Sequence, residues 1–140
     1  MRTACSALIV VMLALALGAC GESKEDKALS SVCDARDDIG KQVDTLKGLT
    51  PATVTTDAVT KSLDAIKKDV QDIADARKDL SSDRRSEVDA ANKSFTSSIQ
   101  QIAGELGTSL SASDAKAGLV TALQQLSASY EKAYAPLNCE

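Results

Sequence analysis

The fold is decided by residues 57–107, DAVTKSLDAIKKDVQDIADARKDLSSDRRSEVDAANKSFTSSIQQIAGELG. This stretch holds no Pro, and no Gly before Gly104. Its apolar residues recur at intervals of three and four, which is the spacing of one face of an α-helix. They are Val59, Leu63, Ile66, Val70, Ile73 and Leu80 in the first part, and Val88, Ala91, Phe95, Ile99, Ile102 and Leu106 in the second. Residues 81–87 between the two parts are all polar. The stretch predicts either two helices joined at 81–85 or one helix of about 50 residues, about 75 Å long.

A helical pattern also precedes this stretch, over residues 23–48. Ser23 and Asp26 have the spacing of a capping box, in which each side chain satisfies a backbone amide of the first turn. The stripe that follows is Leu29, Val32, Arg36, Ile39, Val43 and Leu46. Gly48 ends the segment. Residues 49–56 then form a linker, because Pro51 disfavours a helical residue before it.

The last helical segment is predicted from Ser111 to about Tyr134, and Pro136 stops it. Together these patterns predict an all-α fold. We expect an antiparallel bundle of four helical segments, since the seven polar residues at 81–87 favour a turn there. The alternative is three helices with one long central helix, straight or kinked, and the absence of Gly near Ser82 favours it.

The N-terminus has the three-part pattern of a secretion signal. Arg2 is followed by an apolar run over residues 7–17, which is too short to cross a bilayer as a helix. The run ends in Leu17, Gly18, Ala19 and Cys20. These four residues resemble a lipobox, the recognition site of bacterial type II signal peptides, and the resemblance covers the first 20 residues.

This resemblance implies that the chain is a bacterial lipoprotein. Residues 1–19 would be a signal peptide that is removed, and Cys20 would carry a diacylglyceryl group, with a fatty acid such as palmitate on its amine. Residues 20–22 would then be a lipidated tether, and residues 23–140 a single helical domain. Membrane lipid is the partner implied, with the protein on the outer face of the cytoplasmic membrane or in the outer membrane.

Two cysteines remain after lipidation, Cys33 and Cys139. Export places them in an oxidising compartment, where such a pair is read as a disulfide. The bond would close a loop of 107 residues and would stabilise the fold by about 4–5 kcal/mol in the chain-entropy model. A metal or redox site is a poor alternative, because the chain has no His and the pair lacks a Cys-x-x-Cys spacing.

Composition argues against several functions. Without residues 1–19 the chain loses only Arg2 among its charged residues, which leaves 15 basic and 20 acidic residues and a net charge of −5. This charge argues against nucleic acid as a partner. The absence of His removes the commonest general base, and there is no Gly-x-Ser-x-Gly pattern. We therefore expect a protein that is not an enzyme and has no cofactor.

Two smaller features of the sequence allow two interpretations each. Asp34, Asp37 and Asp38 share a helix face and could hold a hard cation, but we expect a solvated face with an Asp37–Lys41 pair and no metal. The tyrosines 130 and 134 could form a recognition pair, but we expect them to close the core beside the C-terminal tail.

Arg84 and Arg85 are the only adjacent arginines in the chain. In the four-segment layout they occupy a turn at the same pole as Cys20. We therefore consider them as a membrane-facing basic pair, each worth at most about 1 kcal/mol on anionic lipid. A solvated turn is the alternative.

The region beyond the lipobox resembles small, uncharacterised helical secreted proteins and lipoproteins of bacteria. These have one cysteine in the first helix, here within VCDARDD at residues 32–38, and one at the C-terminus. The resemblance implies no activity. We expect a lipid-anchored cell-envelope protein that acts as a non-catalytic scaffold or interaction module for an unknown envelope protein. The alternative is an envelope binding protein that holds a small apolar ligand between its helices, which an enclosed cavity would favour.

Overall fold

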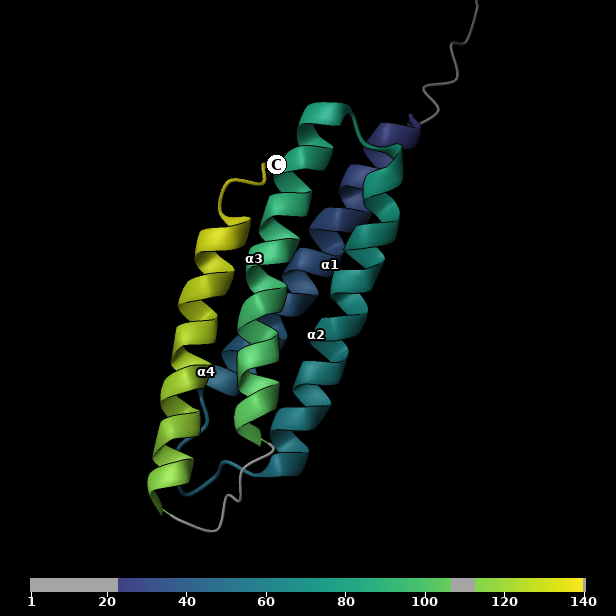
Figure 1. Ribbon diagram of the computed structural model, residues 1–140. Coiled ribbons are helices and arrows are strands. Elements are labelled where there is room, and N and C mark those ends of the chain that lie inside the picture. Colours follow the sequence, from purple (N-terminus) through teal and green to yellow (C-terminus); the bar gives the residue numbers. More distant parts are fainter. Residues whose placement is uncertain (1–22, 107–112, 140) are drawn as a thin grey trace, which may run out of the picture.

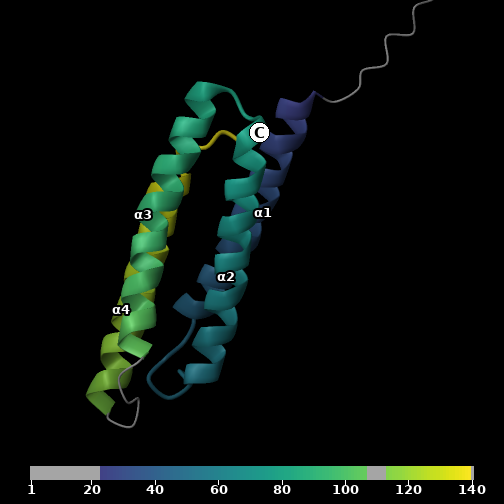
Figure 2. The ribbon, with the colours of Figure 1, turned by 45° about the vertical axis from the view of Figure 1, so that its right-hand side comes forward.

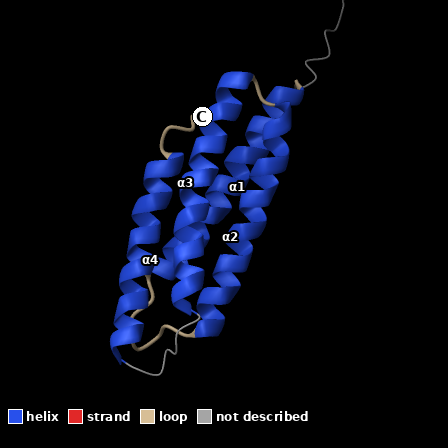
Figure 3. Cartoon of the chain, viewed as in Figure 1, coloured by secondary structure: helices blue, strands red, loops and turns tan. Residues whose placement is uncertain are grey.

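The computed structural model describes residues 23–106 and 113–139. These residues form four α-helices, with a short 3₁₀ helix, η1 (Arg77–Asp79), after the second of them. The α-helices are α1 (Lys24–Lys47), α2 (Thr56–Ala76), α3 (Ser82–Leu106) and α4 (Ser113–Tyr134) (Figure 3). The all-α, four-segment prediction is confirmed. The single long central helix is wrong, because the chain changes direction between α2 and α3.

The helices run alternately up and down, and each packs on two neighbours. α1 packs on α2 and α4, while α3 packs on α2 and α4 (Figure 1). The start of α1, the turn between α2 and α3, and the end of α4 therefore lie at one pole. Figure 2 separates the bundle into two hairpins, one of α1 and α2 and the other of α3 and α4.

The helix starts follow from side-chain caps. Ser23 and Asp26 form the predicted capping box, with the Ser23 hydroxyl accepting from the Asp26 amide at 3.0 Å. Thr55 caps α2 by accepting from the Ala58 amide at 3.2 Å. Such caps satisfy amides that have no partner within the helix.

The turn between α2 and α3 begins earlier than the polar run suggests. It spans 77–81, and residues 82–85 are already the first turn of α3. Leu80 explains the difference, because it is extended in the backbone and only 4% exposed. The chain turns around this buried leucine, so the prediction that Arg84 and Arg85 occupy the turn is wrong.

The core runs the length of the bundle along the predicted stripes. On α1 the buried face is Ala28, Val32, Ala35, Ile39, Val43 and Leu46, while Leu29 and Arg36 are only partly buried. The two alanines are buried because α1 contacts both α2 and α4, so its covered face is wider than one stripe.

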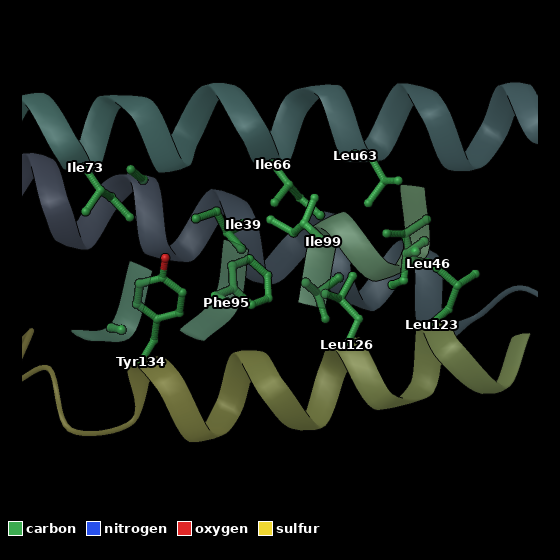
Figure 4. Close-up of a cluster of buried hydrophobic side chains, with 14 of the residues drawn as sticks. Ile39, Leu46, Leu63, Ile66, Ile73, Phe95, Ile99, Leu123, Leu126 and Tyr134 are labelled. Carbon is green, nitrogen blue, oxygen red and sulfur yellow. The ribbon is translucent and has the colours of Figure 1, made fainter. Parts of the chain in front are cut away.

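The core has two halves, with Ile73 and Tyr134 toward one end and Leu46, Leu63 and Leu123 toward the other (Figure 4). The disulfide half contains Ile73, Asn92, Tyr134 and the Cys33–Cys139 bond. The loop half lies next to the 49–55 connection and contains Val43, Leu46, Val59, Leu63, Ile99, Ile102, Leu119, Leu123 and Leu126. None of the described helices is long and apolar enough to cross a membrane.

Candidate functional site

The candidate site is the pole where the disulfide half ends, because the segments next to the proposed anchor and the C-terminal tail meet there. Cys33 on α1 is bonded to Cys139, with their Cα atoms 5.5 Å apart and a sequence separation of 106. The predicted disulfide is therefore present. Cys139 is partly buried and packs against the core, so the bond holds residues 135–139 on the side of α1.

The tail is also held by a hydrogen bond from α1. The Arg36 guanidinium donates to the carbonyl of Leu137 at 3.3 Å, and the Leu137 side chain is buried. Arg36 pairs as well with Asp37 at 2.8 Å. These contacts explain why an arginine stands in an apolar stripe: its stem covers the core while its head reaches the tail.

Three aromatic rings contact one another in one cluster. Phe95 lies edge-on to Tyr130 and Tyr134, with ring centroids 5.8 and 5.5 Å away, and the two tyrosine rings are 5.4 Å apart. Tyr134 is 2% exposed, whereas Tyr130 is partly exposed. The prediction that the tyrosines close the core is therefore confirmed for Tyr134 and holds in part for Tyr130.

Both phenols donate hydrogen bonds. The Tyr134 hydroxyl donates to Oδ1 of the buried Asn92 at 2.6 Å, and the Tyr130 hydroxyl donates to the Arg36 carbonyl at 2.8 Å. Burial raises the pKa of both phenols. Gly40 permits the second contact, because a Cβ at this position would lie 2.8 Å from the Tyr130 hydroxyl oxygen. The sequence patterns predicted no role for Asn92 or Gly40.

The two adjacent arginines have structural partners. The Arg85 guanidinium donates to the carbonyls of Lys78 and Leu80 at 3.0 and 3.1 Å, so it holds the turn at 77–81. Arg84 Nε lies 3.9 Å from the Glu25 carboxylate on α1, which also accepts from the amide of Ser81 at 3.3 Å. Arg85 therefore ties the turn to α3, whereas Arg84 and the Ser81 amide meet the start of α1 at Glu25.

The acidic face on α1 is paired differently from the prediction. Lys41 pairs with Asp38 at 2.7 Å, and Asp37 pairs with Arg36, so the predicted Asp37–Lys41 pair is wrong. The bond to Asp38 raises the pKa of Lys41. Asp34 and Asp38 line an open groove of about 530 Å³ against α2. Among the described residues no group of three acidic or cysteine side chains is placed to hold a metal ion.

Two open grooves lie beside the tail, and both are lined in part by Pro136 and Leu137. One, of about 250 Å³, lies between α1 and α3 and has Leu29 and Val88 in its walls. The other, of about 300 Å³, lies along α3 and α4 and is lined by Ala90 and other small residues. Large side chains fill the interior between the helices, among them Phe95, Tyr134, Ile39, Leu46, Leu63, Ile66, Leu123 and Leu126 (Figure 4).

The proposed lipobox, Leu17, Gly18, Ala19 and Cys20, lies outside the described residues. Comparison of the chain with protein-family models, with curated proteins and with solved structures finds no match.

Proposed function

We propose that the protein is a lipid-anchored protein of the bacterial cell envelope that acts as a non-catalytic helical scaffold or interaction module. The observation that carries the proposal is the position of the first cap. Ser23 already caps α1, so only residues 21 and 22 separate Cys20 from the folded domain. A tether of this length would hold the bundle close to the bilayer surface, with the start of α1 nearest to it.

The architecture of this pole is consistent with an anchored end. The disulfide, the tail and the turn between α2 and α3 all meet α1 between Glu25 and Arg36, through Cys33, Arg36 and Glu25. A pull on the tether would therefore be shared among α1, the turn and the tail. Arg84, whose side chain is 45% exposed, would lie near the lipid headgroups, whereas Arg85 is held by backbone carbonyls.

The rest of the surface supports a scaffold or interaction module rather than a carrier of small molecules. Ion pairs three or four residues apart lie on the exposed faces of α1 and α2, such as Lys41–Asp38 at 2.7 Å and Lys68–Asp72 at 2.5 Å. A small apolar ligand between the helices would have to displace core side chains such as Phe95 and Leu126, because large residues fill that space. A partner protein would therefore bind to the exposed outer faces of the helices.

The test is to express the full chain in a bacterium that is fed an alkyne analogue of palmitate. We expect the wild-type chain to carry the label, to sediment with membranes and to have the mass of a chain that begins at Cys20. Cys20→Ser should lose the label and the membrane association, while Cys5→Ser should keep both. A wild-type chain without label, or a labelled Cys20→Ser chain, would overturn the anchor.

The interaction role is tested separately, by cross-linking in intact cells followed by affinity capture. We expect the wild-type protein to capture a defined envelope protein in stoichiometric amounts, and Cys20→Ser to capture less of it. If both chains capture the same abundant proteins as an unrelated lipoprotein does, the interaction role fails and the anchor stands.

A further inference from the structure

The covalent links that the described residues make between the two hairpins both lie at one end of the bundle. Within the described residues two covalent links connect the α1–α2 hairpin to the α3–α4 hairpin, the chain segment 77–81 and the Cys33–Cys139 bond. Both lie in the disulfide half, on opposite sides of the bundle, because 77–81 joins α2 to α3 while the disulfide joins α1 to the tail after α4. At the other end, the loop 49–55 connects α1 to α2 and so lies within one hairpin (Figure 2).

Polar contacts that cross between the hairpins reinforce the same end. Arg77, which follows α2, pairs with Asp89 of α3 at 2.8 Å. On the other side, the Arg36 guanidinium of α1 donates to the carbonyl of Leu137 in the tail after α4 at 3.3 Å. Each of these contacts has a fixed direction and length, so each resists the sliding or parting of the hairpins where it is made.

The loop half meets across a seam of aliphatic side chains. One hairpin contributes Val43, Leu46, Val59 and Leu63, and the other contributes Ile99, Ile102, Leu119, Leu123 and Leu126. The hydrophobic effect that holds such a seam is non-directional and scales with the buried area. The aliphatic seam can therefore part gradually, with a cost that grows as area is exposed, whereas opening the disulfide half must break the specific bonds described above.

We propose that the bundle has a built-in hinge: the two hairpins part at the loop half while the disulfide half stays closed. The pivot is formed by residues 77–81 on one side and by Cys33–Cys139 on the other. Opening would present the aliphatic seam to the surroundings without unfolding the helices. This inference goes beyond the scaffold role and does not depend on the lipid anchor.

The test uses single buried cysteines as reporters of opening, in residues 20–140 carrying Cys20→Ser, which retain the whole described bundle. Leu63→Cys and Ile73→Cys form a matched pair on α2, since both residues are buried and lie in opposite halves. Ile102→Cys and Val88→Cys form the corresponding pair on α3. A maleimide reagent labels each thiol only when it becomes exposed, while the native disulfide stays oxidised and does not react.

We expect Leu63→Cys and Ile102→Cys to be labelled at least tenfold faster than their partners, after each rate is divided by the unfolded fraction that a urea titration gives for that variant. Their rates should also rise less steeply with urea than global unfolding does, because partial opening exposes less surface. Equal normalised rates at all four positions would mean that exposure requires complete unfolding, and would overturn the hinge.

A second measurement leaves the core intact, in case a core cysteine prevents folding. Spin labels at the exposed Lys61 and Gln101 report on the loop half, and labels at the exposed Lys27 and Lys132 report on the disulfide half. The hinge predicts a longer second distance, or a broad tail, for the first pair and one narrow distance for the second. A single narrow distance for both pairs would overturn it.

Discussion

The two halves of this bundle are held by different kinds of interaction. The disulfide half is held by specific bonds between particular atoms. These are the Cys33–Cys139 disulfide, the hydrogen bond from Tyr134 to Asn92, and the hydrogen bond from Arg36 to the tail. In the loop half, aliphatic side chains such as Leu63 and Leu123 are covered on all sides by their neighbours. The first half specifies geometry, and the second contributes buried area.

The difference matters because the chain has little aromatic surface to bury. It has one Phe and two Tyr among 140 residues, and all three rings meet in one cluster. Aromatic side chains supply the largest buried areas, so the loop half must depend on many small contributions. A single substitution should therefore lower the free energy of unfolding most in the disulfide half, where it can remove a whole specific bond. In the loop half it removes only one of many contacts, so the loss should be smaller.

The largest effect is expected from Cys33→Ser combined with Cys139→Ser. Loss of a link across 106 positions should lower the free energy of unfolding by about 4–5 kcal/mol, since the unfolded chain regains the entropy of an open loop. Urea titration followed by helical circular dichroism measures the loss. Reduction of the wild-type protein should give the same midpoint as the double variant, and a loss below about 1 kcal/mol would contradict the view that the bond dominates its half.

Most of the fold could be predicted from local patterns. The Ser23 cap and the C-terminal ends of α1 and α4 follow from residues within one or two turns, as does the choice of four helices over three. The predicted start of the last helix at Ser111 lies outside the described residues. The position of the turn between α2 and α3 could not be read in this way. It depends on Leu80, which belongs to an apolar stripe in the sequence but is buried by the tertiary packing of the turn itself.

The candidate site could be predicted only in part. Cys33 and Cys139 follow from compartment and count, but the partners of Arg84 and Arg85 include backbone carbonyls and a carboxylate from another helix. No spacing in the sequence encodes such contacts. Asn92 is another example: its acceptor serves Tyr134, which is 42 residues away in the chain. The role of Cys20 stays a prediction.

A cavity in the loop half should have the next largest effect. Leu123→Ala removes a buried side chain of α4 and should cost about 3 kcal/mol, within the usual range of 2–5 kcal/mol for such a change. Val120→Ala on the same helix is the control, because Val120 is only partly buried and should cost clearly less. Thermal and urea unfolding of both variants measure the difference. Equal losses would show that the seam is not packed as tightly as the buried leucines indicate.

Tyr134→Phe should have a smaller effect, and it tests the disulfide half without touching the disulfide. The change keeps the ring contacts but leaves the Asn92 amide oxygen buried without its 2.6 Å donor. We expect a loss of about 1–3 kcal/mol, which is the cost of a buried polar group without a partner. Tyr130→Phe is the matched control, because Tyr130 is partly exposed and donates to a helix carbonyl. If Tyr130→Phe lowers the free energy of unfolding more than Tyr134→Phe does, the view that the buried Tyr134–Asn92 bond contributes more to stability is wrong.

Tyr134→Phe should also change how the free energy of unfolding depends on pH. Burial raises the pKa of Tyr134 above its ordinary value of 10.0, so at alkaline pH the phenol keeps its proton in the folded state and loses it in the unfolded state. Its contribution is therefore complete below about pH 10 and falls as the pH rises above that value, by up to about 1.4 kcal/mol per pH unit. Urea midpoints between pH 8 and 11 should fall more steeply for wild type than for Tyr134→Phe, which has no proton to lose there. Parallel curves would mean that the ring is not held protonated by the fold, and the contrast between the halves would then rest on the disulfide alone.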